Sequence, residues 1–191
     1  MNYQLTENIK HSQVYNPGGI IRLYLLDYED YLSCRFLDDG MFTSGYIEEM
    51  DSTTTFVEVA CTNATSFSEK VDDGLYTQSL QSFVNVLEAA KLSDLLRAAS
   101  RRYIVAFRNL TGKMFCFATD GGATLSFEQA TGQIGEGAGY RLTFAKKSTM
   151  PLFELDSATF NKTEIIDLLA SEDEDIVTTE NNRNTITIKK A

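Results

Sequence analysis

The 191-residue sequence is poor in the residues that most often carry catalysis or hold metals, with one histidine and three cysteines. A histidine-based triad, dyad or metal site would have to use His11, which lies in a polar N-terminal stretch. Such a stretch is a poor place to hold a base within the tolerance of catalysis. Cys34, Cys61 and Cys116 are odd in number and widely spaced, so we expect small core residues rather than a disulfide framework or a zinc site. We therefore predict no catalytic residue, no metal site and no cofactor.

Long apolar runs and clusters of positive charge are also missing. No apolar run approaches the ~18 residues that a bilayer-spanning helix needs, and Met1 to Lys10 lacks a secretory hydrophobic region, so we expect no membrane partner. The formal net charge of −10 argues against a broad grip on nucleic-acid phosphates. A negative surface lets DNA pass without sticking, although solubility alone also explains such a charge.

One glycine-rich stretch resembles a phosphate-binding loop only superficially. Gly135 to Gly139 is followed by a predicted strand, whereas the dinucleotide-binding fingerprint opens a helix. The Gly-Lys-Ser/Thr of a P-loop does not occur. We interpret residues 132–138 as a hairpin loop.

Carboxylates gather in three places, and paired carboxylates can hydrolyse glycosides when rigid elements project them into a cleft. We expect these three clusters in solvated turns and in a tail, so a carboxylate hydrolase is the weakest of our functional hypotheses. The clusters are Glu48-Glu49 with Asp51, Asp72-Asp73, and Glu172 to Asp175.

The stretch from Leu75 to Lys113 indicates the fold class. An alternating strand, Leu75 to Val86, precedes an amphipathic helix at about 88–100, and further strands follow from Arg102. We predict an α+β fold that is mainly antiparallel β, with this one flanking helix. The helix is expected to bury Leu92, Leu95 and Leu96 against the sheet. The dense apolar content of Ile20 to Leu26 predicts a strand buried on both faces.

The chain divides into three parts by composition. Residues 1–19 form a polar arm that ends in a strong turn signal, and residues 20–156 form the β domain. Residues 157–191 form an extension with a short C-terminal helix, opened by a capping box at Asn161 to Glu164, and a mobile tail. Within this tail, Thr185 to Lys189 is a weak strand, for which we favour disorder or pairing with a partner over pairing within the chain.

The segment from Asp27 to Asp51 has two interpretations. It is either a hairpin or pair of short core strands, or a long loop that contacts another protein through exposed aromatic and methionine side chains. The candidate intersubunit contacts, including two residues of the late strand, are Tyr28, Tyr31, Phe36, Met41, Phe42, Tyr46, Ile186 and Ile188.

Two sequence patterns carry a resemblance to a known group. Tyr76 to Leu80, and Arg102 to Phe107 with Thr111-Gly112-Lys113, resemble tail proteins predicted in phages and prophages of Bacteroidetes hosts. Downstream, Ala130-Thr131-Gly132 and Tyr140 to Phe144 fit the same pattern. The resemblance covers about 74–156, under half of the chain, and its motifs are structural rather than catalytic.

The order of elements is similar to that of tail-tube-like proteins. That resemblance implies a rolled β-sandwich or barrel with a helix on its flank, and a ring of identical subunits, often a hexamer. Residues 27–51 stand where the long loop of that family would reach a neighbouring ring. The extension from about Phe160 departs from a minimal tube domain and leaves a connector, terminator or baseplate role open.

We therefore expect a non-enzymatic structural subunit of a phage virion tail, of the tail-tube or head-tail connector or terminator type. The expected partners are copies of the chain in a ring and other virion tail proteins, with DNA only passing through a lumen. Such a subunit would be assembled in the bacterial host cytoplasm and reside in the virion. The alternative is a small-molecule or carbohydrate-binding β-sandwich module whose site is lined by the Tyr and Phe residues of 24–46.

Overall fold

The computed structural model describes residues 18–37, 44–59, 65–131 and 137–157, and the backbone of 177–179 and 186–188. In chain order the elements are β1 (Ile20–Asp27), the short 3-10 helix η1 (Tyr28–Asp30), β2 (Tyr31–Phe36), β3 (Tyr46–Ser52), β4 (Val57–Val59), β5 (Ser66–Asp72), β6 (Leu75–Val84), α1 (Ala89–Ala98), β7 (Arg102–Asn109), β8 (Met114–Phe117), β9 (Ala123–Ala130), β10 (Gly139–Ser148), β11 (Phe153–Leu155), β12 (Val177–Thr179) and β13 (Ile186–Ile188). No helix of the described part is long and apolar enough to cross a membrane.

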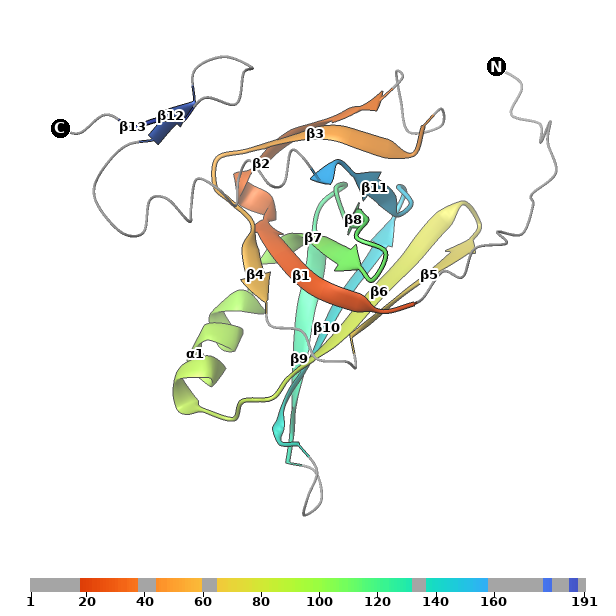
Figure 1. Ribbon diagram of the computed structural model, residues 1–191. Coiled ribbons are helices and arrows are strands. Elements are labelled where there is room, and N and C mark those ends of the chain that lie inside the picture. Colours follow the sequence, from red (N-terminus) through yellow and green to blue (C-terminus); the bar gives the residue numbers. More distant parts are fainter. Residues whose placement is uncertain are drawn as a thin grey trace.

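One large sheet contains the first eleven strands (Figure 1). Its order is β2-β3-β11-β8-β7-β9-β10-β6-β5, with β1 on the other side of β7 and β4 beside β1. All pairs are antiparallel except β3 with β11. The predicted fold class, mainly antiparallel β with one helix, is confirmed for the described residues.

The sheet is open, so the expectation of a closed barrel is wrong. Closure would require the end strands β2 and β5 to pair with each other, and they lie at opposite ends of the strand order. The pairing of β2 with β3 is irregular at two points, between Tyr31 and Ser33 and between Arg35 and Phe36. Such bulges bend a strand and terminate pairing rather than continue it.

Strands β7 and β8 are buried on both faces, and so is β1 from Leu23 onward. The expectation for Ile20 to Leu26 is confirmed only for this part, because Ile21 is 46% exposed. Leu23 belongs to one core cluster and its neighbour Tyr24 to another, and both side chains are buried. Successive residues of a strand point to opposite faces. In β7, Val105 accordingly belongs to the same cluster as Leu23, and Ala106 to the same cluster as Tyr24.

Two cores result, one on each face of these central strands. The first core joins β1, β7 and β8 to β6, β9 and β10; its buried members are Leu23, Leu80, Val105, Phe107, Phe117, Ala118, Ala123, Leu125, Tyr140, Leu142 and Phe144. The second core joins the same central strands to β3 and β11; its buried members are Tyr24, Ile47, Ala106, Met114, Cys116, Phe153 and Leu155.

Helix α1 confirms the predicted helix but not all of its buried face. Leu92 and Leu95 pack partly against the first core, whereas the Leu96 side chain is 60% exposed. The expectation that Leu96 is buried is wrong because the contact row steps by three residues along 92, 95 and 98, and position 96 lies about 100° around the helix from 95. The Tyr103 hydroxyl donates to the Ala98 carbonyl at 3.1 Å and fixes the end of the helix.

Strand β6 shows the predicted alternation with one wet face. Leu80 is fully buried, while Thr77 and Gln81 on the opposite face are exposed. The buried face also carries two polar residues, Gln78 and Ser82. The turn from β5 into β6 is the predicted hairpin, with positive φ at Asp73 and Gly74 as a type I′ turn requires.

The C-terminal strand differs from expectation. β13 pairs with β12 within the chain, in an antiparallel two-stranded sheet separate from the large one. We overlooked the β-branched content of Val177 to Thr179, which favours a strand. The short C-terminal helix, most of the N-terminal arm, and residues 132–136 of the predicted hairpin loop lie outside the described residues.

Candidate functional site

The described residues of 27–52, which are 27–37 and 44–52, form short strands rather than a wholly irregular loop. β2 and β3 pair antiparallel, with Cys34 opposite Met50 and Arg35 opposite Glu49. Because β2 ends the large sheet, its outer side pairs with no strand in the part of the chain that the structure describes. We call this outer side, with the exposed side chains Leu32 and Leu37, the β2 edge.

The inward side chains of this segment help to build the second core. The Phe36 ring meets Phe153 edge-on with 4.9 Å between the ring centroids. Cys34 and Met50 pack against the same cluster. The interpretation as core strands therefore accounts for the described inward residues.

The β2 edge exposes leucines that the sequence did not single out. Leu32 lies at the irregularity between Tyr31 and Ser33, and its side chain is 64% exposed. Leu37 follows the end of the strand and is also exposed. An unpaired strand edge that also exposes apolar side chains is a template for pairing with another chain.

The predicted contact residues are divided among different surroundings. Tyr28 and Tyr31 are half-buried, with 5.9 Å between their ring centroids. Tyr46 is half-buried in β3, where its backbone pairs with Glu154 of β11. Met41 and Phe42 lie outside the described residues, and Ile186 and Ile188 lie in β13. The structure therefore brings Tyr28, Tyr31, Phe36 and Tyr46 to neighbouring elements, with Phe36 turned into the core.

The surface of the β2–β3 pair is acidic. One arginine, Arg35, serves two carboxylates: it lies 2.9 Å from Glu49 and 3.4 Å from Glu48. The Ser33 hydroxyl donates to Asp51 at 3.0 Å. These carboxylates project from a strand, not from a turn as expected. Three carboxylates against one guanidinium leave this pair of strands net negative.

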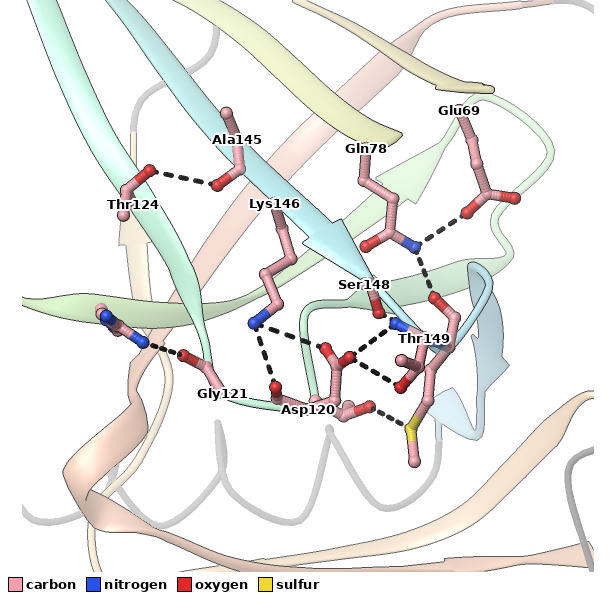
Figure 2. A network of polar contacts seen from close by, with 12 residues as sticks. Glu69, Gln78, Asp120, Gly121, Thr124, Ala145, Lys146, Ser148 and Thr149 are labelled. Carbon is pink, nitrogen blue, oxygen red and sulfur yellow. Dashed lines mark hydrogen bonds and ion pairs between the residues drawn. The ribbon is translucent and has the colours of Figure 1, made fainter. Parts of the chain in front are cut away.

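A second region, which we call the polar corner, surrounds the turn between β8 and β9 (Figure 2). Asp120 accepts hydrogen bonds at Oδ2 from the Thr149 backbone N–H at 2.8 Å and from its hydroxyl at 3.1 Å. The Lys146 ammonium donates to the Asp120 carbonyl at 3.0 Å and lies 3.7 Å from Oδ1. These contacts join the end of β10 to the turn.

The turn that presents Asp120 needs unusual backbone angles. Ala118, Gly121 and Gly122 all have positive φ, and the Gly122 N–H donates to the Ala118 carbonyl at 2.9 Å. At Gly122 a Cβ would lie 2.7 Å from the Cβ of Arg102, so glycine is required there by close packing as well as by φ.

The pKa of Asp120 is lowered in this setting. Burial alone would raise it, but the Thr149 N–H, the hydroxyls of Ser148 and Thr149 and the Lys146 charge favour the carboxylate. The group is therefore an acceptor held in its charged form. It is not a proton donor at neutral pH.

The polar corner continues onto β5 and β6 through Gln78, whose side chain is 1% exposed. Its amide donates to Glu69 at 2.8 Å and to the Met150 carbonyl at 3.0 Å, and Glu69 also accepts from the Leu152 N–H at 2.8 Å. Figure 2 shows this branch beside the Asp120 branch. Residues 148–152 are thus held from two sides, which fixes where β11 begins.

The arrangement suits a structural clamp better than a catalytic site. Ser148 is fully buried and accepts from the Met150 N–H at 2.9 Å. Only 16% of each of the Lys146 and Asp120 side chains is exposed, and each faces the other. A substrate would have to displace these internal contacts. Sequence analysis missed the corner because its members are far apart in the chain.

The two described cysteines, Cys34 and Cys116, are core residues, and Cys61 lies outside the described residues. Burial raises the pKa of the Cys116 thiol, and the nearby Cys34 adds to the shift, so the reactive thiolate is disfavoured. Both are free cysteines of the second core. Across the described residues, no three or more histidine, cysteine or acidic side chains are grouped so that they could hold a metal ion.

Comparisons with models of protein families, with curated proteins and with solved structures give no significant match to this chain. The function is therefore argued from the surfaces and contacts described above.

Proposed function

We propose that the protein is a non-enzymatic structural subunit of a phage virion tail, of the tail-tube or head-tail connector or terminator type, that assembles into rings. The observation that carries the proposal is the open sheet. β2 and β5 end its main path and β4 ends the branch through β1, and exposed apolar side chains, Leu32 and Val71, lie on β2 and β5. Unpaired strand edges recruit strands of other chains, so the fold suits assembly.

A ring also requires two different contact patches on each subunit. Cyclic symmetry beyond a dimer uses a heterologous interface, in which one patch of a subunit contacts a different patch of the next. Both end regions are net negative: the β2–β3 pair carries three carboxylates and one arginine, and β5 carries Glu69 and Asp72 with Lys70. They differ in degree, because the β2–β3 pair has the larger excess of negative charge. A mainly antiparallel β fold with the single helix α1 also agrees with the tail-tube resemblance.

The carbohydrate-binding alternative gains no support from the described aromatic residues of 24–46. Tyr24 is buried in the second core, and Phe36 packs against Phe153. These two rings already fill the interior, whereas Tyr28, Tyr31 and Tyr46 are half-buried. An acidic subunit also fits a role in which DNA passes without binding.

The test is the mass of the full chain in solution. Multi-angle light scattering coupled to gel filtration, from low micromolar to several hundred micromolar protein, should show a concentration-dependent species whose mass is a whole multiple of the subunit mass. Negative-stain electron microscopy of the same fractions should show closed rings or short tubes. A protein that remains monomeric throughout this range, without particles, would overturn the proposal.

A further inference from the structure

The C-terminal strand pair is poorly supported within its own chain. β12 and β13 form a sheet of only two strands, and such hairpins are marginally stable in water unless they pack or pair further. Ile186 and Ile188 lie opposite Thr179 and Val177 in its register. A β-branched strand of this kind gains most by extending another sheet.

The last sixteen residues have a charge opposite to that of the chain as a whole, and the acidic run Glu172 to Asp175 directly precedes them. Residues 176–191 contain three basic residues, Arg183, Lys189 and Lys190, and one acidic residue, Glu180, whereas the full chain has a formal charge of −10. The two lysines directly follow β13. A segment of this composition is attracted to an acidic strand edge.

Of the strands that end the large sheet, β2 matches this segment best. Its strand pair carries Glu48, Glu49 and Asp51 against a single Arg35, and it exposes Leu32 and Leu37. The β5 end is less negative, because Lys70 lies between Glu69 and Asp72, and lysine on an edge strand commonly blocks further pairing. β4, which ends the branch through β1, has only three residues. A strand beside β2 would also place its own side chains next to Leu32.

We propose that β13 of one copy docks beside β2 of a second copy and extends that copy's sheet. This inference rests on the proposed function and names the two patches of its heterologous interface. Nineteen residues separate Ser157 from Val177. A chain of that length spans at most ~65 Å, which exceeds the roughly 40 Å diameter of a domain of this size, so the segment can reach a neighbour.

Three variants of the full chain separate donor from acceptor. Leu32→Ser alters the acceptor, Ile186→Ser with Ile188→Ser alters the donor, and Val71→Ser is the matched control on β5, where the side chain is 58% exposed. Because Leu32 and Val71 are exposed, circular dichroism and thermal unfolding should show an unchanged fold for both. Sedimentation velocity is the readout. The acceptor and donor variants should each weaken association about tenfold or more, as loss of a central contact does, and the control should associate like the wild type.

Mixing the two impaired variants tests whether docking occurs between chains. The acceptor variant keeps an intact β13, and the donor variant keeps an intact β2, so a mixture should form one-to-one complexes that neither forms alone. A mixture that stays monomeric overturns the inference. The inference is also overturned if the Val71→Ser control loses association as much as the other variants do. It is overturned as well if the wild type and all variants assemble alike, but that result leaves the proposed function standing. A wild type that never assembles overturns the proposed function itself.

Discussion

Gly139 offers a sharp test of how β10 enters the sheet. It is the first residue of β10 and pairs with Ala130 of β9. A Cβ at this position would lie 2.1 Å from the carbonyl oxygen of Val84 and 3.0 Å from the Cα of Asn85. Both are backbone atoms, so no side-chain rotation relieves the contact. We predict that Gly139→Ala forces β10 away from the end of β6.

The loss of stability in Gly139→Ala follows from the separation of β10 from the end of β6. Carbon and oxygen need more than 3 Å between them, so the strands must move apart by about 1 Å where Tyr140 pairs with Val84. Losing one or two ladder hydrogen bonds costs ~1 kcal/mol each, and residual overpacking costs ~1–3 kcal/mol. Together these give a loss of about 2–5 kcal/mol in the free energy of unfolding. For a chain of this size that lowers Tm by roughly 4–20 °C.

Gly137→Ala is the matched control for this prediction. A Cβ there would first meet Asn85 Oδ1 at 3.2 Å, which is the movable end of a side chain. Its effect should stay within about 1 kcal/mol. The chain has no tryptophan and nine tyrosines, so urea unfolding is followed by far-UV circular dichroism and tyrosine fluorescence. A Gly139→Ala variant within 0.5 kcal/mol of the wild type, roughly the error of such measurements, would refute the strand contact.

Four further substitutions probe the cores and the polar corner by urea unfolding. Leu95→Ala should lower the free energy of unfolding by ~1–2 kcal/mol because its side chain is half-buried, whereas the exposed Leu96→Ala should cost at most ~0.5 kcal/mol. Phe153→Ala should cost ~3–5 kcal/mol because the ring is fully buried against Phe36. Asp120 has a lowered pKa, so its carboxylate stabilises the fold above the ordinary value of 3.8 and loses this effect as the pH falls through the folded-state pKa. The stability difference between wild type and Asp120→Asn should therefore shrink between pH 7 and pH 3.

Each of these has a result that contradicts it. Equal losses for Leu95→Ala and Leu96→Ala would show that the helix presents a different face. A Phe153→Ala loss below ~1 kcal/mol would mean that the second core is not closed by β11. A wild-type advantage over Asp120→Asn that grows on acidification would contradict the sign of the pKa shift.

Elements with local signals could be predicted from the sequence. The alternation of β6 is a property of consecutive residues, and the Asp73-Gly74 turn is a property of two. The helix was predicted within two residues of its ends for the same reason. These signals depend on backbone preferences and periodicity, which act over a few positions.

Long-range pairings could not be predicted in this way. β3 lies parallel to β11 although Tyr46 and Glu154 are more than one hundred positions apart. Asp120 and Lys146 meet across 26 positions, and Gln78 reaches Met150 across 72. Gln78 is a polar residue on the buried face of β6, so the alternation of apolar and polar residues does not predict its position. Its hydrogen-bond partners explain why it is buried.

The β2 edge shows why an assembly surface is harder to predict than a core. The sequence draws attention to the aromatic residues of 27–51, yet Phe36 turns inward, and the exposed large apolar residues of β2 and its end are leucines. The reason is the irregularity between Tyr31 and Ser33: Leu32 lies between these two paired residues and has no opposite residue in β3. A one-residue shift exchanges the faces of a strand, and a bulge makes that shift at a single point. A count of alternating residues cannot locate it, because the position of the bulge depends on the partner strand. If β13 of a neighbour docks here, the specificity of docking depends on this local break in register and on the acidic residues of β3. Variants that replace the aromatic residues of 27–51 should therefore affect folding before they affect assembly.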